Sequence, residues 1–280
     1  MKNFNLSPLG AGIGLRHQHF AEIISNRPKL GWLEIIVEDF MGQGGPAIEQ
    51  FQEIAKYYPI VGHSVCMSIG SSDPLDFEYL ANYREFLREI NSPWTSDHLC
   101  FTMVDHSNLN ELLPLPFTIE SANNVIERVK IVQNELERPF LLENVTRYLT
   151  LSDREMSELE FINTILEEAN CGLLLDLTNV YLNSKVFDFD PLEFIKALPL
   201  SRVGQIHLAG YEPNSDGSII DSHDAPVTPE VWDLLEKTLS LIGPTSVLIE
   251  RDRNLPPIES LASEAASAET LINKVCGAWR

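Results

Sequence analysis

The chain has 280 residues, of which 44% are hydrophobic and 22% are charged, so it carries enough apolar side chains for a sizeable core. It has 41 acidic and 20 basic residues, and a net charge of −21 excludes nucleic acid and anionic membrane surfaces as expected partners, because both are bound through Lys and Arg. Residues 1–16 lack the pattern of a signal peptide, and no run reaches the roughly 18 apolar residues of a membrane span. We therefore expect a cytoplasmic protein.

Short apolar runs alternate with amphipathic stretches along the chain. Eight runs are typical of buried parallel strands: 11–16, 32–38, 60–66, 95–101, 140–144, 172–177, 204–209 and 246–251. Eight segments with helical periodicity follow them: 17–26, 46–58, 75–90, 119–136, 156–169, 191–198, 229–242 and 259–276. In the seventh, Thr228 and Pro229 form a helix start, and Val231, Leu234 and Leu235 recur at helical spacing.

This alternation predicts an α/β fold, a (β/α)8 TIM barrel. Repeated strand–helix units imply parallel strands with right-handed crossovers, and eight units imply closure. An open doubly wound sheet is the alternative, but Gly10, Gly12 and Gly14 alternate along the first strand and no GxGxxG follows it. No linker interrupts the pattern, so we expect one domain over residues 1–280. The long connections 102–118 and 210–227 follow strands and are expected as loops on the catalytic face.

Polar residues stand where the predicted strands end. In the sixth, an apolar run stops at Asp176, and Asn179 follows three residues later. Asp176 is either the N-cap of the next turn or a functional group, since a carboxylate ending a buried strand needs compensation. Strand ends of a barrel meet at one mouth. There we expect nine side chains of metal-ligand type: His63, His98, Glu143, Asp176, Asn179, His207, Asp221, His223 and Glu250.

The carboxylates of this set predict bound cations. Four of the nine residues are acidic, and such groups cannot all stay ionised side by side without positive charge. Nine ligands suffice for two or three ions, with Glu143 or Glu250 bridging. Imidazole and oxygen ligands suit iron, manganese or zinc. Asp221 and His223 are the strongest candidate pair of metal ligands, because alternate residues of an extended segment face the same way and can bind one ion together. Taken alone, His63 is also typical of a core histidine and Glu143 of a loop cap.

Sequence blocks at these positions resemble a known family. The blocks are Gly-Leu-Arg at Gly14, Gly-Trp-Leu-Glu at Gly31, Gly-His-Ser-Val at Gly62, Ser-Asp-His-Leu-Cys at Ser96, Leu-Pro-Leu-Pro at Leu113, Leu-Glu-Asn-Val at Leu142, Leu-Leu-Leu-Asp-Leu-Thr-Asn-Val-Tyr at Leu173, Ile-His-Leu-Ala-Gly at Ile206, Asp-Ser-His at Asp221 and Ile-Glu-Arg-Asp at Ile249. Together they span nearly the whole chain and resemble the multinuclear non-haem iron-dependent oxidases. These are peptide-modifying relatives of the methanobactin-biosynthesis oxidases, with a xylose-isomerase-like TIM barrel.

The resemblance implies a function and a site. Members of the family bind two or three irons in mixed Fe(II)/Fe(III) valence and use dioxygen to oxidise cysteine residues of a ribosomally synthesised precursor peptide. A small partner protein often delivers the leader of that peptide. The nine ligand positions match the order of ligands in related barrels, and we expect the catalytic ones to be Glu143, Asp176, His207 and Glu250.

The chain departs from the pattern at two positions. Asn179 stands where related barrels have histidine, and Tyr211 stands where many of the oxidases have histidine. We expect Tyr211 near the third metal. Arg251 and Asp252 follow Glu250 directly, and we expect them to orient it.

Three other functions fit a barrel with these ligands. A divalent-metal-dependent sugar isomerase or epimerase would need one or two ions and would work without oxygen. A phosphodiesterase or abasic-site endonuclease is opposed by the net charge of −21. A peptide-binding module with structural metals would have no activity to lose.

Overall fold

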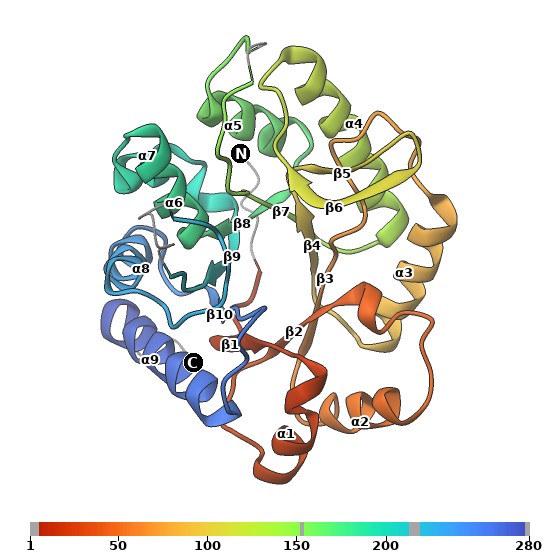
Figure 1. Cartoon of the computed structure of the whole chain (residues 1–280), viewed down its shortest axis with the longest axis vertical. Coiled ribbons are helices and arrows are strands. Elements are labelled where there is room, and N and C mark those ends of the chain that lie inside the picture. The colour runs from red at the N-terminus through yellow and green to blue at the C-terminus, as the bar shows by residue number, and fades with distance from the viewer. Residues whose placement is uncertain (1–5, 152–153, 213–218, 278–280) are drawn as a thin grey trace.

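A computed structural model describes residues 6–151, 154–212 and 219–277, and in it eight parallel strands close into a barrel (Figure 1). The barrel strands are β1 (Ala11–Gly14), β2 (Leu33–Ile36), β3 (Ile60–His63), β4 (Thr95–His98), β7 (Phe140–Glu143), β8 (Gly172–Asp176), β9 (Val203–Leu208) and β10 (Ser246–Ile249). They follow one another around the barrel in chain order, and β10 pairs with β1 to close it. The predicted (β/α)8 barrel is confirmed.

Helices surround the barrel on the outside (Figure 1). They are α1 (Phe20–Asn26), α2 (Pro46–Ile54), α3 (Phe77–Glu89), α4 (Ile119–Leu136), α5 (Glu158–Glu168), α6 (Leu177–Phe187), α7 (Pro191–Ala197), α8 (Pro229–Ile242) and α9 (Ile258–Cys276), with short 3₁₀ helices at His17–His19, Val37–Asp39 and Leu200–Arg202. Among the described residues, none of these helices combines the length and the apolar composition needed to cross a bilayer.

The predicted count of eight helices was wrong, because α6 was not foreseen. It begins directly after Asp176, and its residues are buried on most sides, including polar ones such as Asn179 and Asn183. A helix buried all round has no apolar stripe, so periodicity does not reveal it. Asp176 is the N-cap that one interpretation of the sequence predicted, and its functional role stays a prediction. Its Oδ1 accepts a hydrogen bond from the backbone N–H of Asn179 at 2.6 Å and caps α6, while its Oδ2 remains free of hydrogen bonds inside the barrel mouth.

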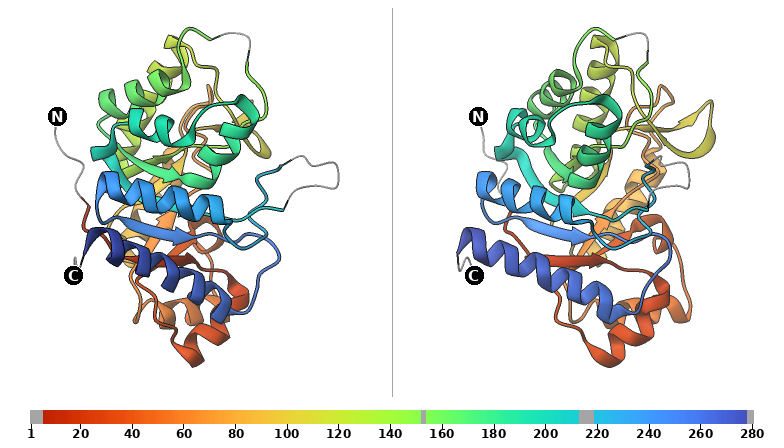
Figure 2. Two further views of the ribbon diagram at one scale, coloured as in Figure 1. Left: turned by 90° about the vertical axis from the view of Figure 1, so that its left-hand side faces the viewer. Right: turned by 60° about the vertical axis from the view of Figure 1, so that its left-hand side comes forward.

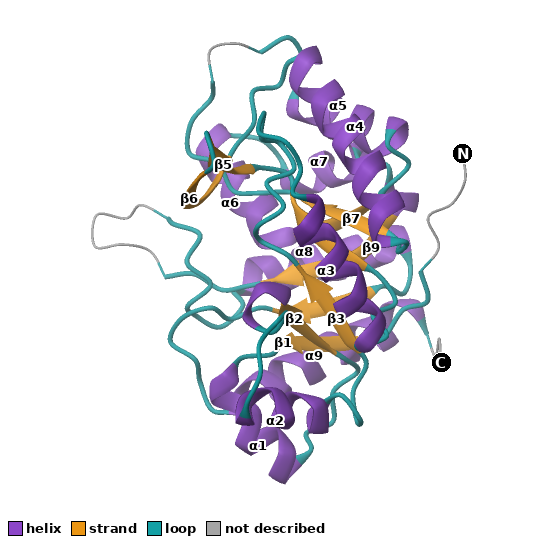
Figure 3. Ribbon diagram, turned by 90° about the vertical axis from the view of Figure 1, so that its right-hand side faces the viewer, coloured by secondary structure: helices purple, strands orange, loops and turns teal. Residues whose placement is uncertain are grey.

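The connection after the fourth strand, expected as a long loop, contains a β-hairpin that the sequence did not predict. Strand β4 ends at His98, and the chain then forms an antiparallel pair, β5 (Phe101–Val104) and β6 (Ser107–Leu113). The turn residues Asp105 and His106 have positive φ angles of 49° and 61°, as tight hairpins require. The hairpin projects from the same end of the barrel as the described parts of the 210–227 connection (Figure 2, Figure 3).

Two apolar cores hold the barrel together. The larger lies between the strands and the surrounding helices. The smaller lies inside the barrel and fills its lower end, where the strands begin. Its buried members are Trp32, Val61, Trp94, Leu141, Leu174 and Leu248. The rings of Trp32 and Trp94 meet edge to face with their centroids 6.1 Å apart. We call this inner cluster the apolar plug. It fills the lower end of the barrel with side chains and leaves only the opposite end for a polar site.

Gly210 ties the 210–227 connection to the barrel, and we expect Gly210→Ala to loosen this tie. Gly210 pairs with Ala225 in an antiparallel bridge, and a methyl group at position 210 would lie 2.1 Å from the carbonyl oxygens of Ala225 and Pro226. The backbone must therefore move, which we expect to lower the free energy of unfolding by about 1–3 kcal/mol in urea denaturation.

Gly44→Ala is the matched control, because a methyl group there meets nothing within 4 Å. It should change the unfolding free energy by less than about 0.5 kcal/mol. Equal urea midpoints for the two variants would contradict the tight approach at Gly210.

Candidate metal centre

The candidate site is the layer of side chains directly above the apolar plug. Successive side chains of a strand point to opposite faces, so a residue two positions after a plug residue also points into the barrel. Four plug residues are each followed at this spacing by a site residue: Val61 by His63, Leu141 by Glu143, Leu174 by Asp176 and Leu248 by Glu250. The register places His207 beside Asp176 of β8 and Glu143 beside His98 of β4. The sequence therefore builds the site by continuing the inward faces of the strands.

Three ligand atoms form the first cluster, from His63, His98 and Glu143. The Nε2 atoms of the two histidines are 3.3 Å apart, and each lies 3.4 Å from Oε2 of Glu143. Ligand atoms about 2.1 Å from one ion lie about 3.0 Å apart in an octahedron and about 3.4 Å apart in a tetrahedron. The other ring nitrogen of His63 is held by Ser96 Oγ at 2.8 Å, which leaves Nε2 facing the cluster. The spacing suits one bound cation.

The second cluster consists of Glu143, Asp176, His207 and Glu250. Nδ1 of His207 lies 3.1 Å from Oε1 of Glu143 and 3.2 Å from Oε2 of Glu250. Glu143 thus turns one carboxylate oxygen to the first cluster and the other to the second. This is the arrangement of a carboxylate that bridges two cations.

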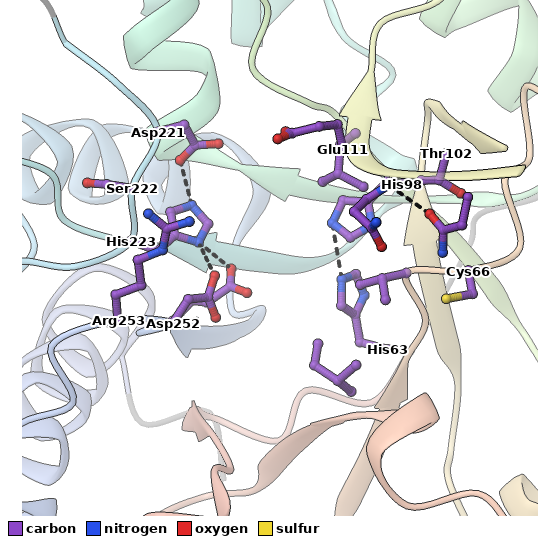
Figure 4. A pocket seen from close by; sticks show the side chains of 16 residues that line it. His63, Cys66, His98, Thr102, Glu111, Asp221, Ser222, His223, Asp252 and Arg253 are labelled. Carbon is purple, nitrogen blue, oxygen red and sulfur yellow. Dashed lines mark hydrogen bonds and ion pairs between the residues drawn. The ribbon is translucent and has the colours of Figure 1, made fainter.

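The third cluster contains His223, Glu250 and Asp252. Nδ1 of His223 lies 3.1 Å from Asp252 Oδ2 and 3.4 Å from Glu250 Oε2. Its Nε2 lies 2.8 Å from Oδ1 of Asp221. Figure 4 shows His223 between Asp221 and Asp252, across the cavity from His63 and His98. Glu250 is therefore shared by the second and third clusters, as Glu143 is shared by the first and second.

Two buried carboxylate oxygens of these clusters lack the partner that burial requires. Among the described residues, Glu143 Oε2 and Asp176 Oδ2 accept no hydrogen bond. A buried polar atom left unsatisfied costs about 1–3 kcal/mol. Cations would satisfy the carboxylate oxygens and offset their mutual repulsion. The residues present therefore fit a multinuclear metal group.

Protons take the place of cations when no metal is bound. Burial lowers the pKa of His98, but Glu143 and Asp97 outweigh burial and raise it to about 9. Burial likewise opposes the charge of His207 and His223, yet their carboxylate neighbours raise both pKa values well above the usual histidine value. Burial, with Glu143 close by, also raises the pKa of Asp176 well above its usual range. The site therefore holds several protons near neutral pH.

The side chains of three predicted site residues, Asn179, Tyr211 and Arg251, make contacts with residues outside the three clusters. Oδ1 of Asn179 accepts a hydrogen bond from Thr146 at 2.5 Å, and its amide donates to the backbone oxygen of Asn144 at 3.0 Å. Both ends of the Asn179 side chain are engaged in holding the chain after β7.

Tyr211 stacks on Tyr181, with ring centroids 6.2 Å apart. Nη2 of Arg251 pairs with Oε1 of Glu264 of α9 at 3.2 Å. The side chain of Asp252 contacts His223 and Arg16. A role of Arg251 and Asp252 in orienting Glu250 stays a prediction.

Two polar residues inside the barrel were missed. Glu34 and Gln205 are buried between the apolar plug and His207. Both stand inside predicted strands and not at the carboxyl ends, where functional side chains were expected. The signal was present, because Glu34 follows Trp32 by two residues and Gln205 precedes His207 by two.

An open cavity of about 500 Å³ lies over the clusters. One wall comes from the β5–β6 hairpin, through residues such as Asn110 and Glu111, and the opposite wall from Ser222 and Arg253. Cys66 also lines it, but burial, with Glu38 and Asp97 nearby, raises the pKa of this thiol to about 12. Cys66 therefore stays protonated and is a poor metal ligand.

The fold places the chain among xylose-isomerase-like TIM barrels. The D-psicose 3-epimerase of Clostridium cellulolyticum H10 superposes with a TM-score of 0.63 at 12% identity, covering 95% of this chain and 98% of the epimerase. A xylose isomerase-like TIM barrel protein from Mycobacterium smegmatis, solved in complex with magnesium, superposes with a TM-score of 0.61 at 10% identity, covering 97% of this chain and all of that protein (100%). At these identities the likeness concerns the fold alone.

The sequence defines the family. The chain belongs to the RiPP precursor modification enzymes MbnB/TglH/ChrH, whose family model matches residues 10–273. A UPF0276 protein of Acaryochloris marina is 40% identical over 94% of this chain and 95% of its own, and one of Caulobacter vibrioides is 38% identical over 91% of each. The resemblance drawn from the sequence blocks is confirmed. The protein is an enzyme of RiPP biosynthesis, which modifies ribosomally synthesised precursor peptides.

We expect metal affinity to depend steeply on pH. Because the pKa of His98 is about 9 in the metal-free protein, a metal ion must displace a proton at neutral pH. Affinity should therefore rise roughly tenfold per pH unit for each displaced proton between pH 6 and 8. Titration of metal-free protein with Zn(II) against a chelator measures this slope. An affinity that does not change with pH would show that the histidines are not ligands.

Proposed function

We propose that this protein is a multinuclear non-haem iron, dioxygen-dependent oxidase that modifies cysteine residues of a ribosomally synthesised precursor peptide. The observation that carries the proposal is the chain of three ligand clusters joined by Glu143 and Glu250 beneath one open cavity. Shared carboxylates keep neighbouring ions close enough to act on one substrate. Membership of the MbnB/TglH/ChrH family supports a peptide as that substrate.

The proposed ligands are those predicted from the sequence, except that the contacts favour Asp252 over Asn179. His63, His98 and Glu143 would hold one ion, and Glu143, Asp176, His207 and Glu250 a second. A third would be held by Asp221, His223 and Glu250, with Asp252 in the place first given to Asn179. Bound iron would supply one-electron redox chemistry toward dioxygen and would acidify a substrate thiol.

The residues around the ions have their own tasks. Glu143 and Glu250 would each offer carboxylate oxygens to two neighbouring clusters, and their negative charge would offset the charge of the cations held there. The hairpin wall and the Asp221–His223 wall bound a cavity of about 500 Å³, large enough for a cysteine and its neighbours in a peptide. Lys and Arg are scarce in this cavity apart from Arg253, so a peptide would enter toward an acidic interior. A small partner protein that binds the leader would place the cysteine.

The test is metal analysis and Mössbauer spectroscopy on protein purified without oxygen, followed by reaction with a candidate precursor peptide. A short reading frame with cysteine codons beside the gene identifies that peptide. We expect two or three irons per chain, oxygen consumption that requires the peptide, and a mass change confined to its cysteine residues. Iron-free protein that modifies the peptide at an equal rate would overturn the proposal.

A divalent-metal sugar epimerase is the second candidate function. The second cluster alone offers four ligands to a single ion, and the structural neighbours include epimerases of ketoses. This function predicts turnover of a ketose by protein loaded with one Mn(II) or Mg(II) under argon. Ketose turnover without oxygen, together with no change in any peptide, would favour the epimerase.

We expect Glu250→Ala to remove iron and activity together. Glu250 faces both His207 and His223, so its loss should empty the second and third sites and leave the first partly filled. Iron per chain should fall from two or three toward one, with oxygen consumption reduced by at least roughly 100-fold. Asp233→Ala is the control, because Asp233 lies exposed on α8 beside Lys237. Normal iron content in the Glu250 variant would contradict the assignment.

A further inference from the structure

A buried polar chain runs beneath His207, inside the barrel and away from the cavity. The indole Nε1 of Trp94 donates to Oε1 of Gln205 at 2.7 Å, and Nε2 of Gln205 donates to Oε2 of Glu34 at 2.6 Å. The second oxygen of Glu34 lies 2.9 Å from Nε2 of His207. All four side chains are buried, and Glu34 is only 3% exposed.

The direction of these hydrogen bonds is fixed by chemistry. An indole N–H only donates, so Trp94 requires the amide oxygen of Gln205 to face it. The amide nitrogen of Gln205 must then face Glu34 and donate to it. Glu34 is thereby anchored through Oε2, with Oε1 held toward His207.

This anchoring favours one of the two tautomers of a singly protonated His207. A carboxylate oxygen 2.9 Å from Nε2 accepts a hydrogen bond from this atom, which favours the proton on Nε2 once Nδ1 has lost its own. In the neutral ring Nδ1 is then bare, and Nδ1 is the atom that faces Glu143 and Glu250. A metal ligand must present a bare nitrogen, and its other ring nitrogen is commonly held by a carboxylate.

Glu34 is needed beside His207 because Gln205 favours the other tautomer of the ring. The amide nitrogen of Gln205 also lies 2.8 Å from His207 Nε2, and this group is a donor. Without the charge of Glu34, the amide would donate to a bare Nε2 and leave the proton on Nδ1, the nitrogen needed by the metal. Two neighbours of Nε2 thus favour opposite tautomers.

We propose that Glu34 is a positioning residue that selects the metal-binding tautomer of His207 and so loads the second metal site. The inference deepens the proposed function, because it rests on His207 being a metal ligand there. Glu34 is not among the residues that line the cavity. It acts through His207 from the closed side of the barrel.

Glu34→Gln tests this proposal with little change of shape. The new amide group is able to donate to Nε2 and removes the charge that holds the proton there. We expect Zn(II) affinity of the second site to fall 10- to 100-fold in chelator competition. In the Zn(II)-loaded wild type, long-range ¹H–¹⁵N spectra of ¹⁵N-histidine-labelled protein should show His207 with its proton on Nε2, and the variant should lose this signature.

Glu38→Gln is the matched control. Glu38 is a carboxylate just beyond β2 that accepts hydrogen bonds from Ser64 Oγ at 2.8 Å and from Tyr79 at 2.7 Å, away from His207. This variant should keep the affinity and the His207 signature. An unchanged affinity in Glu34→Gln, or an equal loss in both variants, would overturn the proposal.

These measurements use the metal alone and do not depend on oxidase activity. If the wild type binds Zn(II) with the expected His207 signature but oxidises no peptide, the proposed function fails while the assignment of Glu34 stands. If the wild type oxidises the peptide and Glu34→Gln binds metal normally, only the assignment of Glu34 fails.

Discussion

The constraint on which this structure depends is the accumulation of carboxylates inside a closed barrel. Glu34, Glu143, Asp176 and Glu250 are all nearly inaccessible to water, and the imidazoles of His63, His98, His207 and His223 stand among them. In such surroundings negative charge persists only beside positive charge, whether protons on the imidazoles or metal ions. The raised pKa values of His98 and His207 and the proposed iron centre are two answers to the same electrostatic demand.

The barrel meets this electrostatic demand by arranging its inward-facing side chains in layers. Its inward faces carry first the apolar plug, then Glu34 with Gln205, then the ligand clusters, and last the cavity between the hairpin and the Asp221–His223 segment. Each layer rests on the one below, because residues two apart on a strand share a face. Packing energy from the plug thus holds functional groups in positions that their own repulsion opposes.

Much of this was predictable from the sequence, since the strand–helix alternation and polar strand ends such as His63, Asp176 and Glu250 are local signals. The missed features are those in which a tertiary environment overrides a local pattern. The α6 helix has no stripe because both its faces are buried, and the β5–β6 hairpin interrupts a segment that resembles a loop. Asp252 contacts His223, and Glu34 contacts His207, across long distances in the sequence, so the two-residue spacing predicts the inward position of Glu34 but not its partner.

The plug made by Trp32 and Trp94 also constrains traffic through the molecule. Since tightly packed indoles obstruct the lower end of the barrel, whatever reaches the centre arrives from above and departs by the same route. A bound polymeric substrate would then cover the opening. Small molecules would have to pass beside it or bind inside before it arrives. The closed lower end of the barrel would thus set the order in which the reactants bind, whatever their affinities.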